Sequence, residues 1–117
     1  MELTPELKKL YPFNSHYLSI DGFNLHYLDE GGETDTDGNE KEVFIMVHGN
    51  PTWSFYYRNM TKELSNRFRV IVLDHMGCGL SDKPENYEYT LERRIHDLGK
   101  LIEFLNIKKF HMMVHDW

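Results

Sequence analysis

The sequence predicts an α/β fold in which a β-hairpin precedes the first strands of a mainly parallel sheet with flanking helices. Two stretches of alternating apolar and polar residues flank an Asp-Gly pair, which is a strong signal for a hairpin. Residues 43–47 are continuously apolar, and residues 69–73 and 110–114 are largely apolar, as expected for strands that are covered on both faces. Helical patterns separate these runs, and strands that alternate with helices indicate parallel pairing.

The chain is long enough for one small domain. Residues 1–13 are expected to form a short helical turn and a loop, because Pro12 limits any helix there. We interpret them as an N-terminal extension of a core that covers residues 14–117. Within this core the predicted strands are, in chain order, residues 16–20, 23–28, 43–47, 69–73 and 110–114.

The segments between the strands predict loops and two helices. Residues 31–41 are polar and contain glycine, so they are expected to form a surface loop, as are residues 74–88. Ser54 is expected to cap a helix that runs to about residue 64. One side of that helix would carry Tyr57, Met60 and Leu64.

A second helix is predicted to begin after Thr90 and to end near Asn106. Its apolar residues follow the helical period and predict one continuous apolar face. That face consists of Leu91, Ile95, Leu98, Leu101, Ile102 and Leu105.

Composition excludes some classes of function. The formal net charge of −6 does not suit binding to a nucleic-acid backbone. Cys78 is the single cysteine, so the chain can form no internal disulfide, and a reducing, cytoplasmic setting is expected. No basic region followed by an apolar run marks a signal peptide at the N-terminus, and the apolar run 43–47 is too short to cross a membrane.

Two polar clusters follow predicted parallel strands, and ligands of such sheets bind beyond the carboxyl ends of the strands. One cluster begins at Gly49, and the other is His115-Asp116-Trp117. Asp116 directly follows a buried strand. A carboxylate is already ionised at neutral pH, so it can act as a nucleophile without a base and form an ester with an electrophilic carbon. The alternative is that Asp116 only caps a following helix.

Asn50 and Trp117 are candidate partners of this carboxylate. The Asn50 amide offers two donors, and the Trp117 indole offers one donor and no acceptor. Their side chains could hold a halide or another leaving anion, and their backbone N–H groups could form an oxyanion hole. The alternatives are a turn residue before a proline for Asn50 and core packing for Trp117.

Other reactive residue types receive structural interpretations. The seven histidines show no metal-ligand spacing, so neither a metal nor another cofactor is predicted. His48 and Gly49 are expected to support the loop that carries Asn50 rather than to act as a base. Cys78 is expected to pack between glycines, and Asp74 to fix the loop that follows its strand.

Three motifs, in their order and spacing, resemble the haloalkane dehalogenase family of α/β-hydrolases. They are His-Gly-Asn-Pro-Thr-Trp-Ser at residues 48–54, Asp-His-Met-Gly-Cys-Gly-Leu-Ser-Asp-Lys-Pro at 74–84 and Val-His-Asp-Trp at 114–117. The segments 53–58 and 76–80 look closer to one branch, the β-lactone decarboxylases of bacterial olefin biosynthesis.

This resemblance implies an α/β-hydrolase fold with Asp116 as nucleophile and with Asn50 and Trp117 as the halide or oxyanion site. It implies a small hydrophobic substrate, either a cis-β-lactone that yields a long-chain olefin or a haloalkane that is hydrolysed to an alcohol. Assembly with other enzymes of olefin biosynthesis is also implied.

The sequence departs from the family pattern in two ways. The family continues past the tryptophan with a cap, further strands, a late histidine and its acidic partner, none of which is found in these 117 residues. We therefore expect catalysis to require the remainder of the chain. In α/β-hydrolases with a serine nucleophile, the turn that carries the nucleophile has glycine two positions before it. Val114 occupies that position here. A non-catalytic interaction module remains the alternative from a different class.

Overall fold

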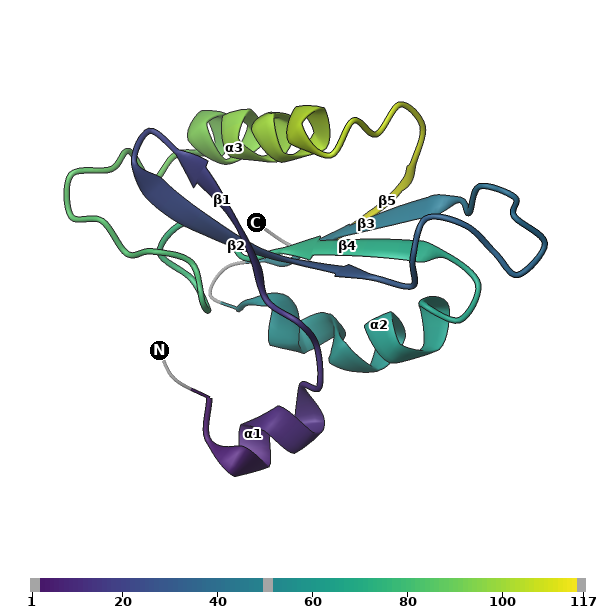
Figure 1. Ribbon diagram of the computed structural model, residues 1–117. Coiled ribbons are helices and arrows are strands. Elements are labelled where there is room, and N and C mark those ends of the chain that lie inside the picture. Colours follow the sequence, from purple (N-terminus) through teal and green to yellow (C-terminus); the bar gives the residue numbers. More distant parts are fainter. Residues whose placement is uncertain (1–2, 50–51, 116–117) are drawn as a thin grey trace.

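The computed structural model describes residues 3–49 and 52–115 (Figure 1). The helical elements there are α1 (Pro5–Leu10), the 3₁₀ turn η1 (Ser54–Tyr57), α2 (Arg58–Leu64) and α3 (Leu91–Phe104). The strands are β1 (His16–Ile20), β2 (Phe23–Glu30), β3 (Val43–Val47), β4 (Arg69–Leu73) and β5 (His111–Val114). The predicted strands are thus confirmed, although β2 extends to Glu30 and β5 begins one residue later than expected.

The strands of the described chain form one mixed sheet in the order β1-β2-β4-β3-β5. β1 and β2 pair antiparallel around Asp21 and Gly22, whose φ angles are 52° and 85°. Positive φ at both positions is what the tightest hairpin turns require, so the Asp-Gly prediction is confirmed. β2 also runs antiparallel to β4, whereas β3 is parallel to both β4 and β5.

Helices cover both faces of this sheet. Figure 1 shows α3 on one face and α2 on the opposite face. Alternate residues of β4 accordingly face different helices: Ile71 and Leu73 belong to the apolar cluster that includes Leu101 of α3, and Val70 and Val72 belong to the other cluster. Burial of each such side chain stabilises the fold by about 1.5–3 kcal/mol.

The predicted cap at Ser54 is wrong. Ser54 lies inside η1 and is buried, and Trp53 precedes the turn without a side-chain capping bond. The Ser54 amide donates to Asp74 Oδ1 at 2.5 Å, so the contacts of Ser54 are made to a residue distant in the sequence. The expected apolar side is also partly wrong, because Met60 is 37% exposed and Thr61 is buried in its place.

The second predicted helix is confirmed as α3. Thr90 caps it, with Oγ1 accepting a hydrogen bond from the Arg93 amide at 3.1 Å, and Asn106 follows its end with a φ of 55°. Its apolar face packs only in part. Leu101 is fully buried, whereas Ile95 is 60% exposed.

The prediction that residues 110–114 form a buried strand is correct for the strand and wrong for its burial. β5 lies at an edge of the sheet, where β3 is its neighbour within the described residues. Val114 is 64% exposed and Met112 is 44% exposed. A strand at an edge presents one unpaired side, so a largely apolar pattern does not guarantee burial.

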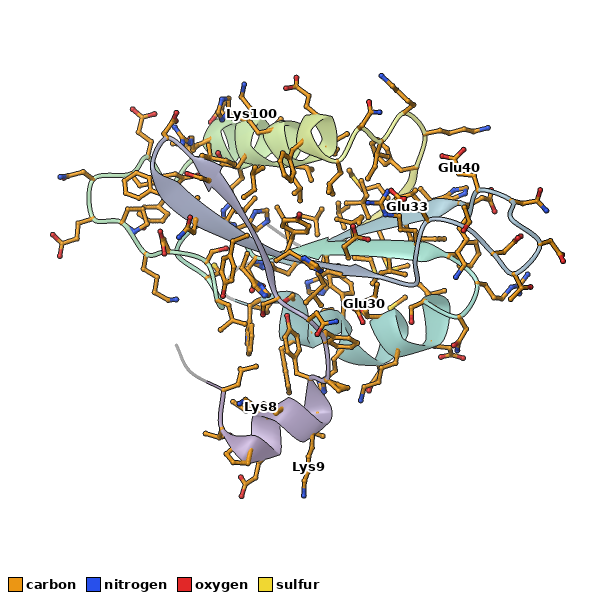
Figure 2. The ribbon with its side chains drawn as sticks, in the orientation of Figure 1. Lys8, Lys9, Glu30, Glu33, Glu40 and Lys100 are labelled. Carbon is orange, nitrogen blue, oxygen red and sulfur yellow. The ribbon has the colours of Figure 1, made fainter. Side chains whose placement is uncertain are left out.

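Charged side chains cover much of the remaining surface. In Figure 2, Lys8 and Lys9 project from α1 and Lys100 projects from α3. Glu33 and Glu40 are exposed on the loop before β3, as predicted for that segment. None of the helices in the described ranges has the length and apolar character needed to cross a bilayer.

Candidate active site

The carboxyl ends of three parallel strands meet at one edge of the sheet. Val47 pairs with Leu73 of β4 and with Val114 of β5, so the three strands end at the same level. The Val47 carbonyl accepts hydrogen bonds from the His115 amide at 3.1 Å and from the Tyr57 hydroxyl at 2.8 Å. The polar segments that follow these strands therefore begin side by side.

Three of the predicted site residues, Asn50, Asp116 and Trp117, lie outside the described residues. Their neighbours in the sequence are described. Gly49 follows β3 and His115 follows β5, and the pairing of these two strands brings both residues to the same edge. The two sequence clusters predicted to cooperate thus leave the sheet at adjacent points.

His48 and Gly49 form a compact corner at the end of β3. His48 Nδ1 donates to the Gly49 carbonyl at 2.6 Å, and His48 Nε2 accepts a hydrogen bond from the His75 amide at 3.0 Å. The Gly49 carbonyl also accepts from the Thr52 amide at 3.2 Å. The His48 ring thereby links the segments that follow β3 and β4.

The imidazoles of His48 and His75 pack against each other with ring centroids 4.4 Å apart. Burial lowers the pKa of His48 below its ordinary value. Burial, followed by the nearby His48 and Arg94, lowers the pKa of His75 to about 3. Both rings are therefore neutral at pH 7. A neutral His48 ring can donate through Nδ1 and accept through Nε2 at the same time, as its two hydrogen bonds require.

Asp74 is the centre of a second group of contacts at this edge. Its carboxylate is fully buried and accepts hydrogen bonds from His26 Nδ1 at 2.8 Å and from the Leu80 amide at 3.1 Å, besides the Ser54 amide. Burial acts to raise the pKa of Asp74, but these donors outweigh it and hold that pKa below its ordinary value. Asp74 is thus an ionised anchor for the loop after β4, as its position in the sequence predicted.

Sequence reasoning missed two members of this group, His26 and Tyr11. His26 lies in β2, and its ring also contacts Ser15 Oγ at 2.9 Å through Nε2. Tyr11 shares a hydrogen bond with Ser54 and is 1% exposed. The sequence offered no local signal for either, because their partners lie 48 and 43 residues away along the chain.

An apolar hollow of about 450 Å³ lies beside the strand ends, between α3 and β5. Its polar lining residues are His48 and His75, which pack against each other, together with His115 and with Arg94 of α3. Arg94 Nη2 lies 3.9 Å from Cys78 Sγ. The lining consists of Val47, His48, His75, Leu91, Arg94, Ile95, Leu98, Met112, Val114 and His115.

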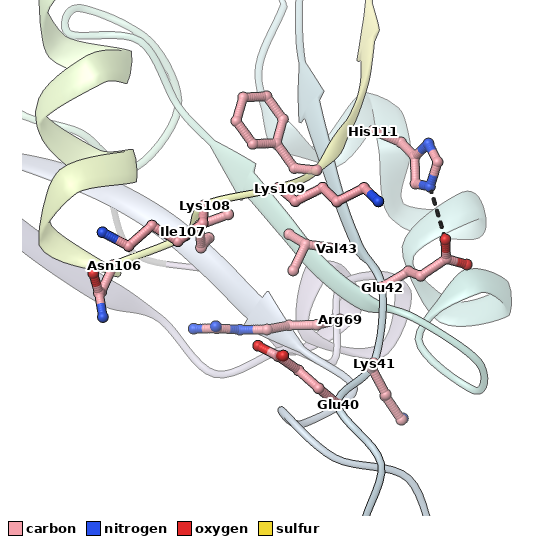
Figure 3. A pocket seen from close by; sticks show the side chains of 11 residues that line it. Glu40, Lys41, Glu42, Val43, Arg69, Asn106, Ile107, Lys108, Lys109 and His111 are labelled. Atoms are coloured by element: carbon pink, nitrogen blue, oxygen red, sulfur yellow. Dashed lines mark hydrogen bonds and ion pairs between the residues drawn. The ribbon is translucent and has the colours of Figure 1, made fainter.

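Another hollow, of about 330 Å³, lies at the opposite end of the strands (Figure 3). It is lined by residues 40–43, Arg69 and residues 106–111. Several of its charged side chains form structural contacts. Arg69 forms two hydrogen bonds with the Asp29 carboxylate, and His111 Nε2 lies 3.3 Å from Glu42 (Figure 3). This hollow is remote from the strand tips, so it does not contribute to the candidate site.

Cys78 lies partly buried in the loop after β4. Burial raises the pKa of the Cys78 thiol, which disfavours the reactive thiolate. Among the described residues, no group of three or more His, Cys, Asp or Glu side chains is placed to hold a metal ion.

This mixed sheet, with helices on both faces and polar loops at the strand tips, is the arrangement of an α/β-hydrolase core. The model of the alpha/beta hydrolase fold family matches residues 42–117, and the chain belongs to this family. It is 49% identical over 114 residues to the cis-3-alkyl-4-alkyloxetan-2-one decarboxylase of Shewanella oneidensis, covering 95% of this chain and 33% of the relative.

A second relative is haloalkane dehalogenase 2 of Mycobacterium tuberculosis. It is 32% identical over 117 residues, which cover 100% of this chain and 38% of the dehalogenase. Among solved structures, a loop variant of the haloalkane dehalogenase DbeA from Bradyrhizobium elkanii superposes with a TM-score of 0.76 at 26% identity, covering 90% of this chain and 33% of that one. The resemblance inferred from the three motifs is confirmed. The chain spans about a third of the length of the curated relatives that it matches.

Proposed function

We propose that the full-length protein is a cis-β-lactone decarboxylase that uses Asp116 as a covalent nucleophile. The observation that carries this proposal is the 49% identity to an oxetanone decarboxylase, because an oxetan-2-one is a β-lactone. The identity to the haloalkane dehalogenase is lower, at 32% over a similar length. The proposal is made for the full-length protein because the relatives are about three times as long as the chain.

The geometry at the strand tips supports a nucleophile at this position. Asp116 follows His115 in the sequence, and the His115 amide is fixed on the end of β3. Asn50 follows Gly49, whose carbonyl is held by His48. A nucleophile and an oxyanion donor at the ends of neighbouring strands are the arrangement on which α/β-hydrolase chemistry depends.

The proposed reaction has two steps. An Asp116 carboxylate oxygen forms a bond to the saturated ring carbon that is bonded to the ring oxygen, and the bond from that carbon to the ring oxygen breaks. This gives an alkyl ester and a free carboxylate. The bond from the neighbouring carbon to the carboxylate carbon then breaks and releases carbon dioxide. Its electron pair forms the alkene as the bond from carbon to the Asp116 ester oxygen breaks, so Asp116 leaves as a carboxylate. Because the first step inverts the carbon and the second is an anti elimination, a cis-lactone gives a cis-alkene.

Asn50 and Trp117 are proposed to stabilise the negative charge that develops on the departing ring oxygen. Donors aimed at developing charge contribute about 10²–10³ in kcat each in comparable sites. His48 and Gly49 are proposed to hold the loop that carries Asn50. The two steps consume no water and no cofactor, and the enzyme carboxylate is regenerated. We also propose a cytoplasmic location, and assembly with other enzymes of olefin synthesis stays a prediction.

Haloalkane dehalogenation is the second candidate, favoured by the match of the whole chain to a dehalogenase. The first step would be the same displacement by Asp116, with halide leaving in place of the ring oxygen. Water would then have to cleave the ester, so a base from the rest of the protein would be needed. The two candidates therefore differ in the fate of one intermediate.

The experiment supplies the full-length protein with a cis-β-lactone or with 1,2-dibromoethane and measures alkene, carbon dioxide and bromide. We expect alkene and carbon dioxide in equal amounts from the lactone and little bromide. Asp116→Ala should abolish turnover, while Asp37→Asn on the exposed loop before β3 should not change it. Turnover retained by Asp116→Ala would remove the nucleophile assignment, and bromide as the main product would favour the dehalogenase.

A further inference from the structure

Tyr11 lies in the segment that was interpreted as an N-terminal extension, yet it is one of the most buried aromatic residues described. Its side chain is 1% exposed, although α1 immediately before it contains no buried residue. The Tyr11 ring lies 5.1 Å from the ring of Phe13 and 5.3 Å from that of Trp53. Phe55 packs against it at 6.0 Å. Tyr11 therefore packs among aromatic side chains that come from the N-terminal segment, from the residue before η1 and from η1 itself.

The hydroxyl of Tyr11 continues this contact into the candidate site. It shares a hydrogen bond with Ser54 Oγ, and the amide of the same serine donates to Asp74 at the end of β4. Burial raises the pKa of Tyr11 above its ordinary value, so its hydroxyl stays neutral and can keep this bond at any physiological pH. A continuous buried path thus runs from the N-terminal segment to the strand tips.

This path fixes one side of the catalytic edge. His48 holds the Gly49 carbonyl on one side, and Ser54 anchors the residues just before η1 on the other. Asn50 and Pro51 stand between these anchors in the sequence. An anchor that shifts by about 1 Å can cost up to about 10²-fold in rate, because reacting groups lose their alignment.

We propose that Tyr11 is a positioning residue for catalysis: its hydroxyl fixes Ser54 and thereby the Thr52–Ser54 arm against Asp74. This inference rests on the proposed function for its effect on rate. Its structural part, the restraint on the arm, is independent of the substrate. Tyr11 touches no reacting atom, so its contribution acts through Ser54.

The test compares the full-length wild-type protein with Tyr11→Phe, Ser54→Ala and the double variant. Tyr17→Phe is the matched control, because it also removes a tyrosine hydroxyl but from a side chain of β1 that is half-exposed. We expect each single variant to lower kcat about 10-fold with KM within about 2-fold, the pattern of an interaction used in the transition state. The double variant should lose no more than either single variant, because both remove the same bond.

Amide hydrogen exchange gives a readout that does not depend on turnover. In Tyr11→Phe, peptides that contain residues 52–57 should exchange faster, while peptides from α3 should be unchanged. Additive losses of kcat, or unchanged exchange around Ser54, would overturn the positioning role. If the wild-type protein turns over neither substrate, the proposed function fails and hydrogen exchange alone decides this inference. If Tyr11→Phe does not fold, Ser54→Ala tests the same bond from its other end.

Discussion

At the scale of single residues, the histidine pair behind the strand tips couples stability to pH. His75 is 5% exposed, and among the described residues its Nδ1 has no hydrogen-bond partner. The buried ring therefore resists taking up a proton, and its pKa falls to about 3. The unfolded chain takes up that proton near pH 6.5. Between these values the unfolded state binds more protons, so the folded state loses stability as the pH falls.

We predict that the free energy of unfolding of the full-length protein decreases from pH 6 to pH 5, with His75 contributing up to about 1.4 kcal/mol per pH unit. His75→Leu should flatten this slope, since its amide still donates to His48. Urea denaturation at the two pH values measures the slope. His96→Leu on the exposed side of α3 is the control, and an unchanged slope in His75→Leu would contradict the prediction.

At the scale of elements, the loop from Asp74 to Leu80 is held by close approach as well as by hydrogen bonds. Gly79 has a φ of 51°, and a Cβ placed there would lie 2.5 Å from Asp74 Oδ2 and 2.8 Å from Trp53 Cβ. The buried carboxylate cannot retreat without losing its donors. The loop after β4 and the segment before η1 therefore require glycine at this point.

We predict that Gly79→Ala destabilises the protein by roughly 3 kcal/mol, measured by urea denaturation. About 1–2 kcal/mol comes from the left-handed backbone and the rest from displaced hydrogen bonds. Gly32→Ala is the matched control, because Gly32 also has a positive φ, of 76°, but a Cβ there meets nothing within 4 Å. Equal losses in the two variants would show that the contact with Asp74 is unimportant.

The elements that the sequence predicted well are those determined by local chemistry. The Asp21-Gly22 turn needs two positive φ angles, and β3 and β4 are apolar on both faces because helices cover both. The turn at Ser54 was mispredicted because its shape depends on Asp74 and Tyr11, which are distant in the sequence. A serine before a helical pattern predicts a cap only when its own partners are local.

The candidate site divides in the same way. That the polar clusters after β3 and β5 start at one edge follows from parallel pairing, which the pattern of strands and helices predicted. The contact of His48 with the segment after β4, and the path through Tyr11, depend on tertiary packing that no periodicity encodes. The roles of Asn50, Asp116 and Trp117 stay predictions.

At the scale of the whole molecule, the described chain carries apolar surface along β5 and the first half of α3. Val114, Met112 and Ile95 are each more than two-fifths exposed. An apolar edge strand offers unpaired backbone groups and favours pairing with another strand. A surface of this kind marks either a contact that completes the sheet or a tendency to self-associate.

We predict that the 117-residue chain, produced by itself, self-associates at micromolar concentration, as measured by sedimentation velocity. Met112→Lys should shift it toward monomer, because a lysine on an edge strand opposes pairing. Tyr17→Lys, on the β1 edge at the other side of the sheet, is the control and should have less effect. A monomeric wild-type chain would show that β5 is protected in a way that the exposed side chains do not indicate.

The loop before β3 leaves the sheet at the end away from the strand tips. Gly38 in this loop has a positive φ, and its surroundings are open, with no atom within 4 Å of an added Cβ. A fluorophore or affinity handle inserted there would therefore be displayed on the far side of the molecule from Asp74 and His48. The protein can thus be immobilised or followed by fluorescence while its chemistry is studied undisturbed.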